Sequence, residues 1–355
     1  MAKKPTLRDV SRATGLSTYT VSRALNDGDD VAPGTREVVR AAARELGYVP
    51  NRVAQELRKN TRSSIAVITA STSNYYYIEM MKGVQRVLRP TGRTAFVADI
   101  AAEGLYSAEV EDATVRQLIQ SRTAGVIATL TLSPENTRLL DDWDIPVVFV
   151  DSAPPAEAVH VPCIATDNVA ASTQVGTHLA EHGYRDWLFL AYPDRWSTRV
   201  DRERGLQEAA KLHGARLEVL ESDNDAESAY RTLEKYLTEL AEALPQAIVA
   251  GNNPMLHGVL RYLRSRGIRV PADVGLIAFD EFPWAPLLDP PLTVLNENSE
   301  EIGELAAQTL TRVIDEQLAA EREGQQPRPR YTAQDRREVP AELVIRQSCG
   351  CSAPS

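Results

Sequence analysis

Three polar side chains of a short helical pattern in the stretch LSTYTVSRALN could recognise DNA bases: Thr18 and Tyr19 at its start, and Arg23 one turn further on. Arginine can donate two hydrogen bonds to one guanine, while threonine and tyrosine can form single hydrogen bonds or contact a thymine methyl group. Val21 and Leu25 are four residues apart and form an apolar face that leaves the three polar side chains exposed together. We therefore interpret them as a candidate base-reading surface.

Neighbouring helices must position this surface. Thr6 and Asp9 have the spacing of a capping box, and Gly15 predicts the end of that first helix. Ser17 is a suitable N-cap for the second helix, and Pro33 is a suitable first residue for a third. Two short helices joined by a Gly-containing turn predict a helix-turn-helix, whose second helix enters the major groove. The alternative is a small helical domain whose polar residues are only solvated.

The charge distribution favours the DNA-binding interpretation. Residues 1–62 contain 12 Lys and Arg against 7 Asp and Glu, whereas the rest of the 355-residue chain contains 27 against 42. The net charge of −10 therefore hides a basic N-terminal segment on an acidic body. A local basic patch is sufficient to release counterions from phosphate.

The segment NRVAQELRKN, residues 51–60, predicts a helix with an apolar stripe of only Val53, Ala54 and Leu57. A helix this short is marginal in water and cannot be stable alone. It is either a plain helical linker or an element that folds only with a partner.

The stretches TLRDVSRATGLSTYTVSRALN and VAPGTREVVRAAARELGYVPNRVAQEL together resemble the DNA-binding head of the LacI/GalR family of bacterial transcription regulators. One departure is Ala32, where the family usually has Ser. The resemblance implies that residues 51–60 form a hinge helix, which folds on the operator and pairs with its copy from a second subunit. Leu57 would then wedge between base steps in the minor groove. The expected DNA contacts are Thr6, Ser17, Thr18, Tyr19, Thr20, Ser22, Arg23, Asn26, Asn51, Ala54 and Leu57.

From Ser64 onward, short apolar runs such as SIAVITA, AGVIATL, IPVVFVD, WLFLAYP and VGLIAFD alternate with helical patterns. This alternation predicts doubly wound parallel sheets, and the number of units favours two lobes. The body also resembles the periplasmic-binding-protein-like core of the same family. The expected divisions are a helix-turn-helix domain at 1–50, hinge helix and linker at 51–63, an effector-binding and dimerisation domain at 64–348 and a tail at 349–355. Within that domain we expect lobe 1 at about 64–164 and 296–328, and lobe 2 at about 165–292 and 331–348.

Ligands of such sheets bind beyond the carboxyl ends of the strands. Aromatic, carboxylate, amide and guanidinium side chains gather at these positions, and they suit a sugar. The candidates are Tyr76, Tyr77, Asp151, Ser152, Trp196, Thr198, Arg202, Asn253 and Asp280. The resemblance places all but Ser152, Trp196 and Thr198 at the family's effector-contact positions, although the family more often has Asp at the position of Asn253.

Some of these residues also have a structural alternative. Asp151 and Asp280 could only cap the turns that follow their strands. Arg202 could be one of several solvated arginines in RVDRERG, and Trp284 could lie in the core or at the rim of the cleft.

Enzymatic chemistry finds little support, because the chain has no G-x-S-x-G, Walker or G-x-G-x-x-G motif. His178 and His182 are four residues apart, but HLAEH lacks the glutamate that a zinc hydrolase has beside its first histidine. Cys349 and Cys351 lie in the tail without an evident third ligand. We therefore expect no metal and no cofactor.

The resulting expectation is an all-α helix-turn-helix head with a hinge helix, followed by an α/β core of two lobes with doubly wound parallel sheets. Such a protein would be a cytoplasmic repressor that binds a palindromic operator as a homodimer and responds to a carbohydrate effector. A sugar-binding transport receptor is the rival, but the head and the lack of a signal peptide argue against it. No apolar run is long enough to span a membrane, and the tail lacks the leucine heptads of a tetramerising helix.

Overall fold

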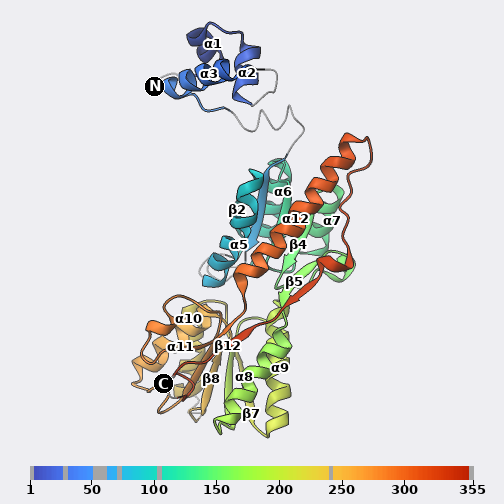
Figure 1. The fold of residues 1–355 in the computed structure, drawn as a ribbon. Coiled ribbons are helices and arrows are strands. Elements are labelled where there is room, and N and C mark those ends of the chain that lie inside the picture. Colours follow the sequence, from blue (N-terminus) through green and yellow to red (C-terminus); the bar gives the residue numbers. More distant parts are fainter. Residues whose placement is uncertain are drawn as a thin grey trace. The chain divides into compact units, whose positions relative to one another are not determined.

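The computed structural model describes residues 4–26, 31–50, 62–69, 74–101, 106–239 and 243–351. The chain divides into two compact units, Met1–Thr61 and Arg62–Ser355, which we call the head and the body (Figure 1). The predicted hinge contacts Asn51, Ala54 and Leu57 lie outside the described residues. Within the described ranges, no helix is both long and apolar enough to cross a membrane.

The described residues of the head form three helices, α1 (Leu7–Thr14), α2 (Thr18–Leu25) and α3 (Pro33–Leu46). The Asp9 carboxylate accepts hydrogen bonds from the Thr6 N–H (2.9 Å) and hydroxyl (2.7 Å), as the capping pattern predicts. The helices enclose a small core formed by Val10, Val21, Ala24, Val31, Val39 and Ala43. This core fixes α2 against α1 and α3 and leaves its N-terminal polar residues outside.

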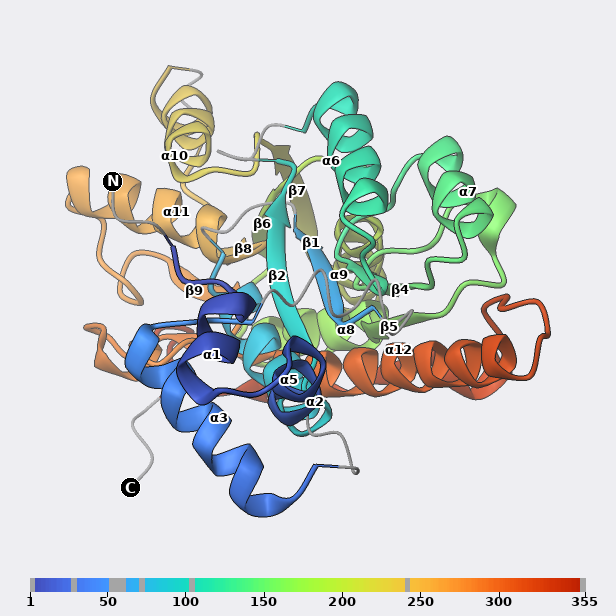
Figure 2. The same ribbon diagram turned by 90° about the horizontal axis from the view of Figure 1, so that it is seen from above.

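Lobe 1 of the body is a six-stranded sheet in the order β11–β5–β4–β3–β1–β2. Helices α5 and α12 cover one face, and α6 and α7 cover the other (Figure 2). The strands are β1 (Ser64–Thr69), β2 (Thr94–Asp99), β3 (Gly125–Ala128), β4 (Val147–Val150), β5 (Cys163–Thr166) and β11 (Arg337–Val339). The helices are α5 (Tyr75–Thr91), α6 (Ala108–Gln120), α7 (Pro134–Asp142) and α12 (Ser299–Arg322), with short helical turns at Ala156–Ala158 and Ala333–Asp335.

Lobe 2 repeats this architecture with the strand order β12–β10–β9–β8–β6–β7. Helices α8 and α9 lie on one face, and α10 and α11 on the other. The strands are β6 (Asp186–Ala191), β7 (Arg216–Glu221), β8 (Ala247–Ala250), β9 (Gly275–Phe279), β10 (Thr293–Asn296) and β12 (Glu342–Val344). The helices are α8 (Asn168–Glu181), α9 (Ser197–His213), α10 (Ala226–Glu234) and α11 (Asn253–Ser265), with helical turns at Lys235–Glu239 and Ala285–Leu287.

Two helical layers on mostly parallel sheets confirm the predicted fold class, with β12 as an antiparallel exception. Two expected lobe boundaries are wrong. Residues 331–348 do not all belong to lobe 2, because β11 pairs in parallel with β5 of lobe 1. Lobe 2 also extends to Asn296, since β10 pairs with β9 up to Leu295 and with β12 at Asn296. The short REV stretch of β11 has no long apolar run, so its strand character was not visible in the sequence.

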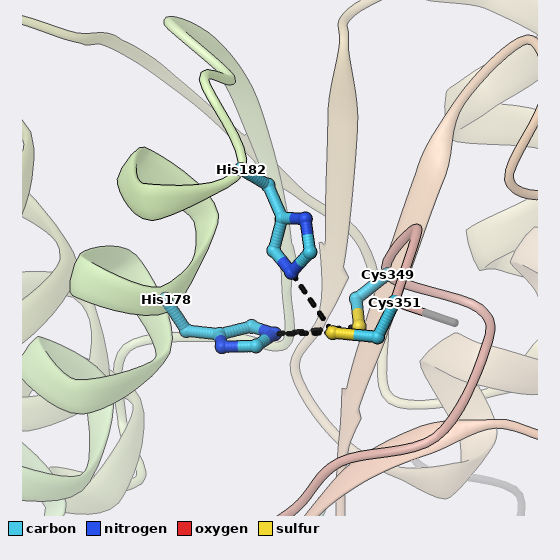
Figure 3. A group of neighbouring side chains, drawn as sticks. All are labelled: His178, His182, Cys349 and Cys351. Atoms are coloured by element: carbon cyan, nitrogen blue, oxygen red, sulfur yellow. Dashed lines mark hydrogen bonds between the residues drawn. The ribbon is translucent and has the colours of Figure 1, made fainter. Parts of the chain in front are cut away.

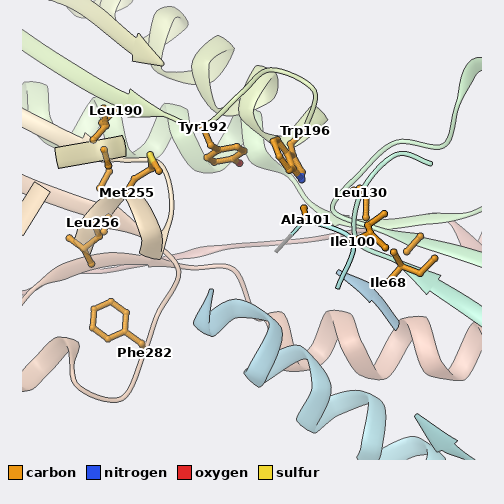
Figure 4. Packing of buried hydrophobic residues seen from close by; sticks show 14 of the residues in the cluster. Ile68, Ile100, Ala101, Leu130, Leu190, Tyr192, Trp196, Met255, Leu256 and Phe282 are labelled. Carbon is orange, nitrogen blue, oxygen red and sulfur yellow. The ribbon is translucent and has the colours of Figure 1, made fainter. Parts of the chain in front are cut away.

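The apolar core continues from one lobe into the other. Figure 4 shows Ile68 and Leu130 of lobe 1 at one end of a buried cluster and Leu190 and Met255 of lobe 2 at the other, with Trp196 between them. Burial of this continuous apolar surface stabilises the lobes against each other. The polar cavity described below lies beside it.

Glycines allow the close approach of α5 and α12 in lobe 1. A Cβ at Gly303 would overlap the main-chain carbonyl of Met80, and one at Gly83 would overlap that of Glu300. The backbones of the two helices therefore pack directly against each other at these positions.

Candidate functional site

Helix α2 carries the predicted base-reading residues, Thr18 and Tyr19 in its first turn and Arg23 in its last turn. Thr18 and Tyr19 are exposed, Tyr19 with 68% of its surface accessible, and Arg23 is half-buried on the same helix. Ser17 caps α2, because its Oγ accepts a hydrogen bond from the N–H of Thr20 (3.0 Å). The arrangement is that of a recognition helix whose first turn can meet base edges.

The other predicted contacts of the head have local structural roles as well. Asn26 donates from Nδ2 to the main-chain carbonyl of Ser22 (2.5 Å) and so closes the C-terminal end of α2. Thr6 lies at the N-terminus of α1 in its capping box. Polar groups at helix ends are suited to phosphate contacts, which fix the register of a protein on DNA without reading its sequence.

In the body, seven of the nine predicted effector contacts line one cavity between the two lobes. These seven are Tyr76, Tyr77, Asp151, Trp196, Thr198, Arg202 and Asp280. Helix N-termini and strand carboxyl ends from both sheets converge there, as expected for doubly wound sheets. Ser152 is buried behind the cavity, with its Oγ 3.5 Å from the carbonyl of Thr129, and Asn253 faces a neighbouring groove that also contains Trp284.

Asp151 and Asp280 follow β4 and β9 with left-handed backbones, at φ of 47° and 70°. Asp tolerates this conformation better than most residues, and outliers of this kind cluster at functional sites. Asp151 accepts hydrogen bonds from the Tyr76 hydroxyl and from the N–H of Thr166 (2.9 Å). Asp280 accepts from the N–H of Asn253 (3.2 Å). Both carboxylates therefore stabilise local structure and also face the cavity.

Arg202 is 4% exposed and is not one of the solvated arginines of α9. Its Nε donates to Asn168 Oδ1 (2.8 Å) and its Nη1 to the carbonyl of Gly251 (2.5 Å). Its Nη2 forms an ion pair with Glu297, which is 1% exposed. The guanidinium also lies 4.1 Å from the ring centroid of Phe279. The cation is thus fixed by four neighbours at the wall of the cavity.

The pKa values at this wall reflect burial and mutual repulsion. Burial raises the pKa of Asp151, and burial together with Asp280 and Asp151 raises the pKa of Glu297 well above its usual range. Burial lowers the pKa of Arg202, but the field of Glu297 and its neighbours outweighs this effect and raises it. One permanent cation therefore faces three buried carboxyl groups, and the pKa values of two of them, Asp151 and Glu297, are raised.

The sequence interpretation missed six residues of this site: Asn74, Thr129, Tyr192, Asn224, Asn252 and Glu297. Asn74 and Asn252 are the N-caps of α5 and α11, so their side chains stand where these helices begin. Helix N-caps after predicted strands were a signal that could have identified both. Glu297 stands directly after β10, in the NENSE stretch between the lobes.

The cavity is small in this structure. Its volume is about 40 Å³, enough for a few water molecules but far below the several hundred Å³ of a typical ligand pocket. Polar contacts join the lobes around it: Asn253 Nδ2 donates to Asn74 Oδ1 (3.2 Å), and the N–H of Ala153 donates to Ser197 Oγ (3.0 Å). A ligand must rearrange these contacts to enter.

A second group of polar residues, outside the cavity, surrounds the two cysteines of the tail. His178 and His182 of α8 lie beside Cys349 and Cys351, and the four potential ligand atoms are all within 4.8 Å of one another. The expectation that no third metal ligand lies near the two cysteines is therefore wrong. The tail folds back onto α8, a contact across 171 positions of sequence between His178 and Cys349.

A helix-turn-helix head joined to a two-lobed body with a polar cavity between its lobes defines a DNA-binding regulator with a ligand-binding domain. Comparison with known proteins identifies the family. The family profile of bacterial regulatory proteins, lacI family, matches residues 6–51, and that of the periplasmic binding protein-like domain matches residues 177–349.

The chain is 28% identical to the HTH-type transcriptional repressor PurR of Vibrio atlanticus over 87% of this chain and 92% of that protein. It resembles a complex of the transcriptional regulator CelR with cellobiose at 26% identity and a TM-score of 0.67, over 97% of this chain and 99% of that one. It shares the fold of the lac repressor dimer bound to operator and the anti-inducer ONPF, at 24% identity and a TM-score of 0.77, over 98% and 99% of the two chains. The protein belongs to the LacI family, whose members are transcription regulators and not enzymes: it is a DNA-binding transcription repressor with an effector-binding domain.

Proposed function

We propose that this repressor binds a palindromic operator as a homodimer and changes its affinity for DNA when a carbohydrate, or a carbohydrate derivative, enters the interlobe cavity. The observation that carries this proposal is the convergence of seven predicted effector contacts on one cavity. The DNA contacts proposed for the head are the exposed residues at the start of α2, and a two-fold dimer would present two such helices to two half-sites. The site of action would be the cytoplasm, where bacterial operator DNA lies.

The lining of the cavity supports a polyhydroxylated ligand. Tyr76, Tyr77, Tyr192 and Trp196 offer flat apolar faces for the C–H face of a sugar ring. Asp151, Asp280 and Arg202 offer charged acceptors and donors for hydroxyl groups, and Asn74, Asn224 and Asn252 add amides. The cellobiose complex of CelR supports the same ligand class. A purine is the second candidate, because aromatic rings and amides can also stack on and pair with a nucleobase.

The proposed hinge helix, residues 51–60, would connect the cavity to the operator. Strand β1 begins at Ser64 and leads to α5, whose first turn carries Tyr76 and Tyr77. A ligand that separates Asn74 from Asn253 would therefore move the part of lobe 1 from which the hinge starts. An effector can shift this equilibrium only by binding one arrangement better than the other.

Thermal unfolding of the full-length chain against sugars, sugar phosphates, sugar acids and purines tests the ligand class. A ligand that binds only the folded state stabilises it by about 2.7 kcal/mol at a concentration of 100 times its Kd. A rise in Tm with a sugar supports the proposal. A rise with purines alone contradicts the carbohydrate assignment while leaving the regulatory site in place.

A further inference from the structure

The cluster of His178, His182, Cys349 and Cys351 lies in lobe 2 and shares no residue with the lining of the effector cavity. Figure 3 shows the two imidazoles projecting from α8 toward the two sulfur atoms of the tail. His178 and His182 are one helical turn apart, so their rings stand on the same face, with centroids 4.7 Å from each other. Neither the repressor function nor the effector cavity uses any of these four side chains.

We propose that these four side chains form a structural zinc site that fastens the C-terminal tail to α8. Two thiolates and two imidazoles are the donor set of tetrahedral structural zinc. Four protein ligands leave no open position for a substrate, so the site would stabilise the fold and perform no catalysis.

The distances in the cluster agree with tetrahedral coordination. Metal–ligand bonds of about 2.3 Å to sulfur and about 2.0–2.1 Å to nitrogen place neighbouring ligand atoms about 3.3–3.8 Å apart. His178 Nε2 lies 3.3 Å from Cys349 Sγ and 3.8 Å from Cys351 Sγ. His182 Nε2 lies 2.9 Å from Cys351 Sγ. This last distance is shorter than the tetrahedral range, and the four ligand atoms are spread over up to 4.8 Å, so side chains such as the exposed His182 must shift to admit the ion.

The surroundings also suit a zinc complex. Two thiolates neutralise the charge of Zn²⁺, and a neutral complex is tolerated next to the apolar cluster to which Cys349 belongs. The Thr293 hydroxyl donates to Cys349 Sγ (3.1 Å), as outer hydrogen bonds commonly do at metal thiolates.

The backbone of the tail is shaped to deliver both sulfur atoms. The Ser348 hydroxyl connects the tail to two strands of the sheet. It donates a hydrogen bond to the carbonyl of Leu276 (2.6 Å) and accepts one from the N–H of Thr293 (2.8 Å). Gly350 follows with φ +95°, a conformation that L side chains rarely adopt, and a Cβ there would lie 2.9 Å from the Tyr184 hydroxyl. This turn places Cys349 and Cys351 on the same side, facing α8.

The metal content of the full-length chain tests the proposal. The protein is purified without a polyhistidine tag or chelator, kept reduced and analysed by plasma mass spectrometry. We expect about one zinc ion per chain. Cys349→Ser and His178→Gln should lose the ion, and the matched control Cys163→Ser should keep it, because Cys163 lies in lobe 1 and donates to the carbonyl of Ser152 (3.3 Å).

Cobalt substitution of the wild-type chain provides a second measurement that does not depend on the folding of variants. Co²⁺ added to the metal-free, reduced protein should produce thiolate charge-transfer and intense visible bands of a tetrahedral S₂N₂ site. Absence of zinc together with absence of these bands overturns the proposal. Equal zinc in wild type and Cys349→Ser, or a Cys349–Cys351 disulfide in the protein kept under reductant, overturns it as well.

Discussion

Replacing Arg202 by Met should destabilise the body strongly. The change removes the guanidinium from Glu297, which is 1% exposed, and leaves that carboxylate buried without its cation. Breaking a buried ion pair in this way costs about 3–5 kcal/mol. Urea unfolding of the full-length chain, followed by circular dichroism and evaluated for the body, measures this loss.

The double variant Arg202→Met/Glu297→Met separates the structural role of Arg202 from its role at the cavity. Two apolar side chains of similar volume remove the unpaired charge, so the double-mutant cycle should return a coupling of about 2–3 kcal/mol. Asn168 Oδ1 and the Gly251 carbonyl each still lose a donor, so recovery should be incomplete. The rescued protein still lacks the guanidinium and should no longer respond to the effector.

A matched control lies on the same helix. Arg204 and Asp201 form an exposed pair at 3.0 Å, and their cycle should give less than about 1 kcal/mol. A loss below about 1 kcal/mol for Arg202→Met would refute the buried-pair reasoning. A double variant that regains both stability and a normal effector response would remove Arg202 from the effector site.

Three further predictions concern other parts of the chain. Arg23→Ala should weaken specific operator binding by about 1–3 kcal/mol and relax the base preference at one position, measured by fluorescence anisotropy on single-base operator variants, with effector affinity unchanged. The pKa values of Asp151 and Glu297 are raised in the folded state, so the contribution of these two groups to the stability of the body should grow as the pH falls from neutral toward about 4, the unfolded carboxyl value, and be lost as the pH rises. Asp151→Asn should reduce this contribution in urea unfolding compared with the wild type, and an unchanged slope would argue against the raised pKa. Gly303→Ala should lower the free energy of unfolding by several kcal/mol, because the new Cβ would overlap the main chain of α5. The control Gly34→Ala on α3 should be neutral or stabilising by up to about 1 kcal/mol, because no atom lies within 4 Å of its Cβ. Equal effects of the two substitutions on Tm would contradict the packing argument.

Local patterns in the sequence were sufficient to predict the continuously apolar strands and several of the residues that follow them. The runs that became β4 and β9 are continuously apolar, so Asp151 and Asp280 could be placed at their ends from the sequence alone. The helix-turn-helix was equally visible, because capping residues and the turn glycine lie close together in the chain.

Features that depend on tertiary contacts could not be predicted in this way. Glu297 contributes to the site because the chain crosses between the lobes there, and nothing local distinguishes it from Glu300 or Glu301. The approach of Cys349 to His178 depends on how the tail packs beside β9 and β10. The lobes are joined around the cavity by contacts such as that of Asn253 with Asn74, and no local sequence pattern predicts which residues make these contacts.

The central claim is that one chain couples sequence-specific DNA binding to occupancy of the interlobe cavity. Its most direct test is to select DNA from a random library with the full-length protein and then to titrate the selected site with and without a ligand found by thermal unfolding. We expect enrichment of a palindrome and a change in operator affinity of about 5–150-fold when the ligand is present. Enrichment of no common sequence, or an operator affinity that stays the same at saturating ligand, would contradict the account.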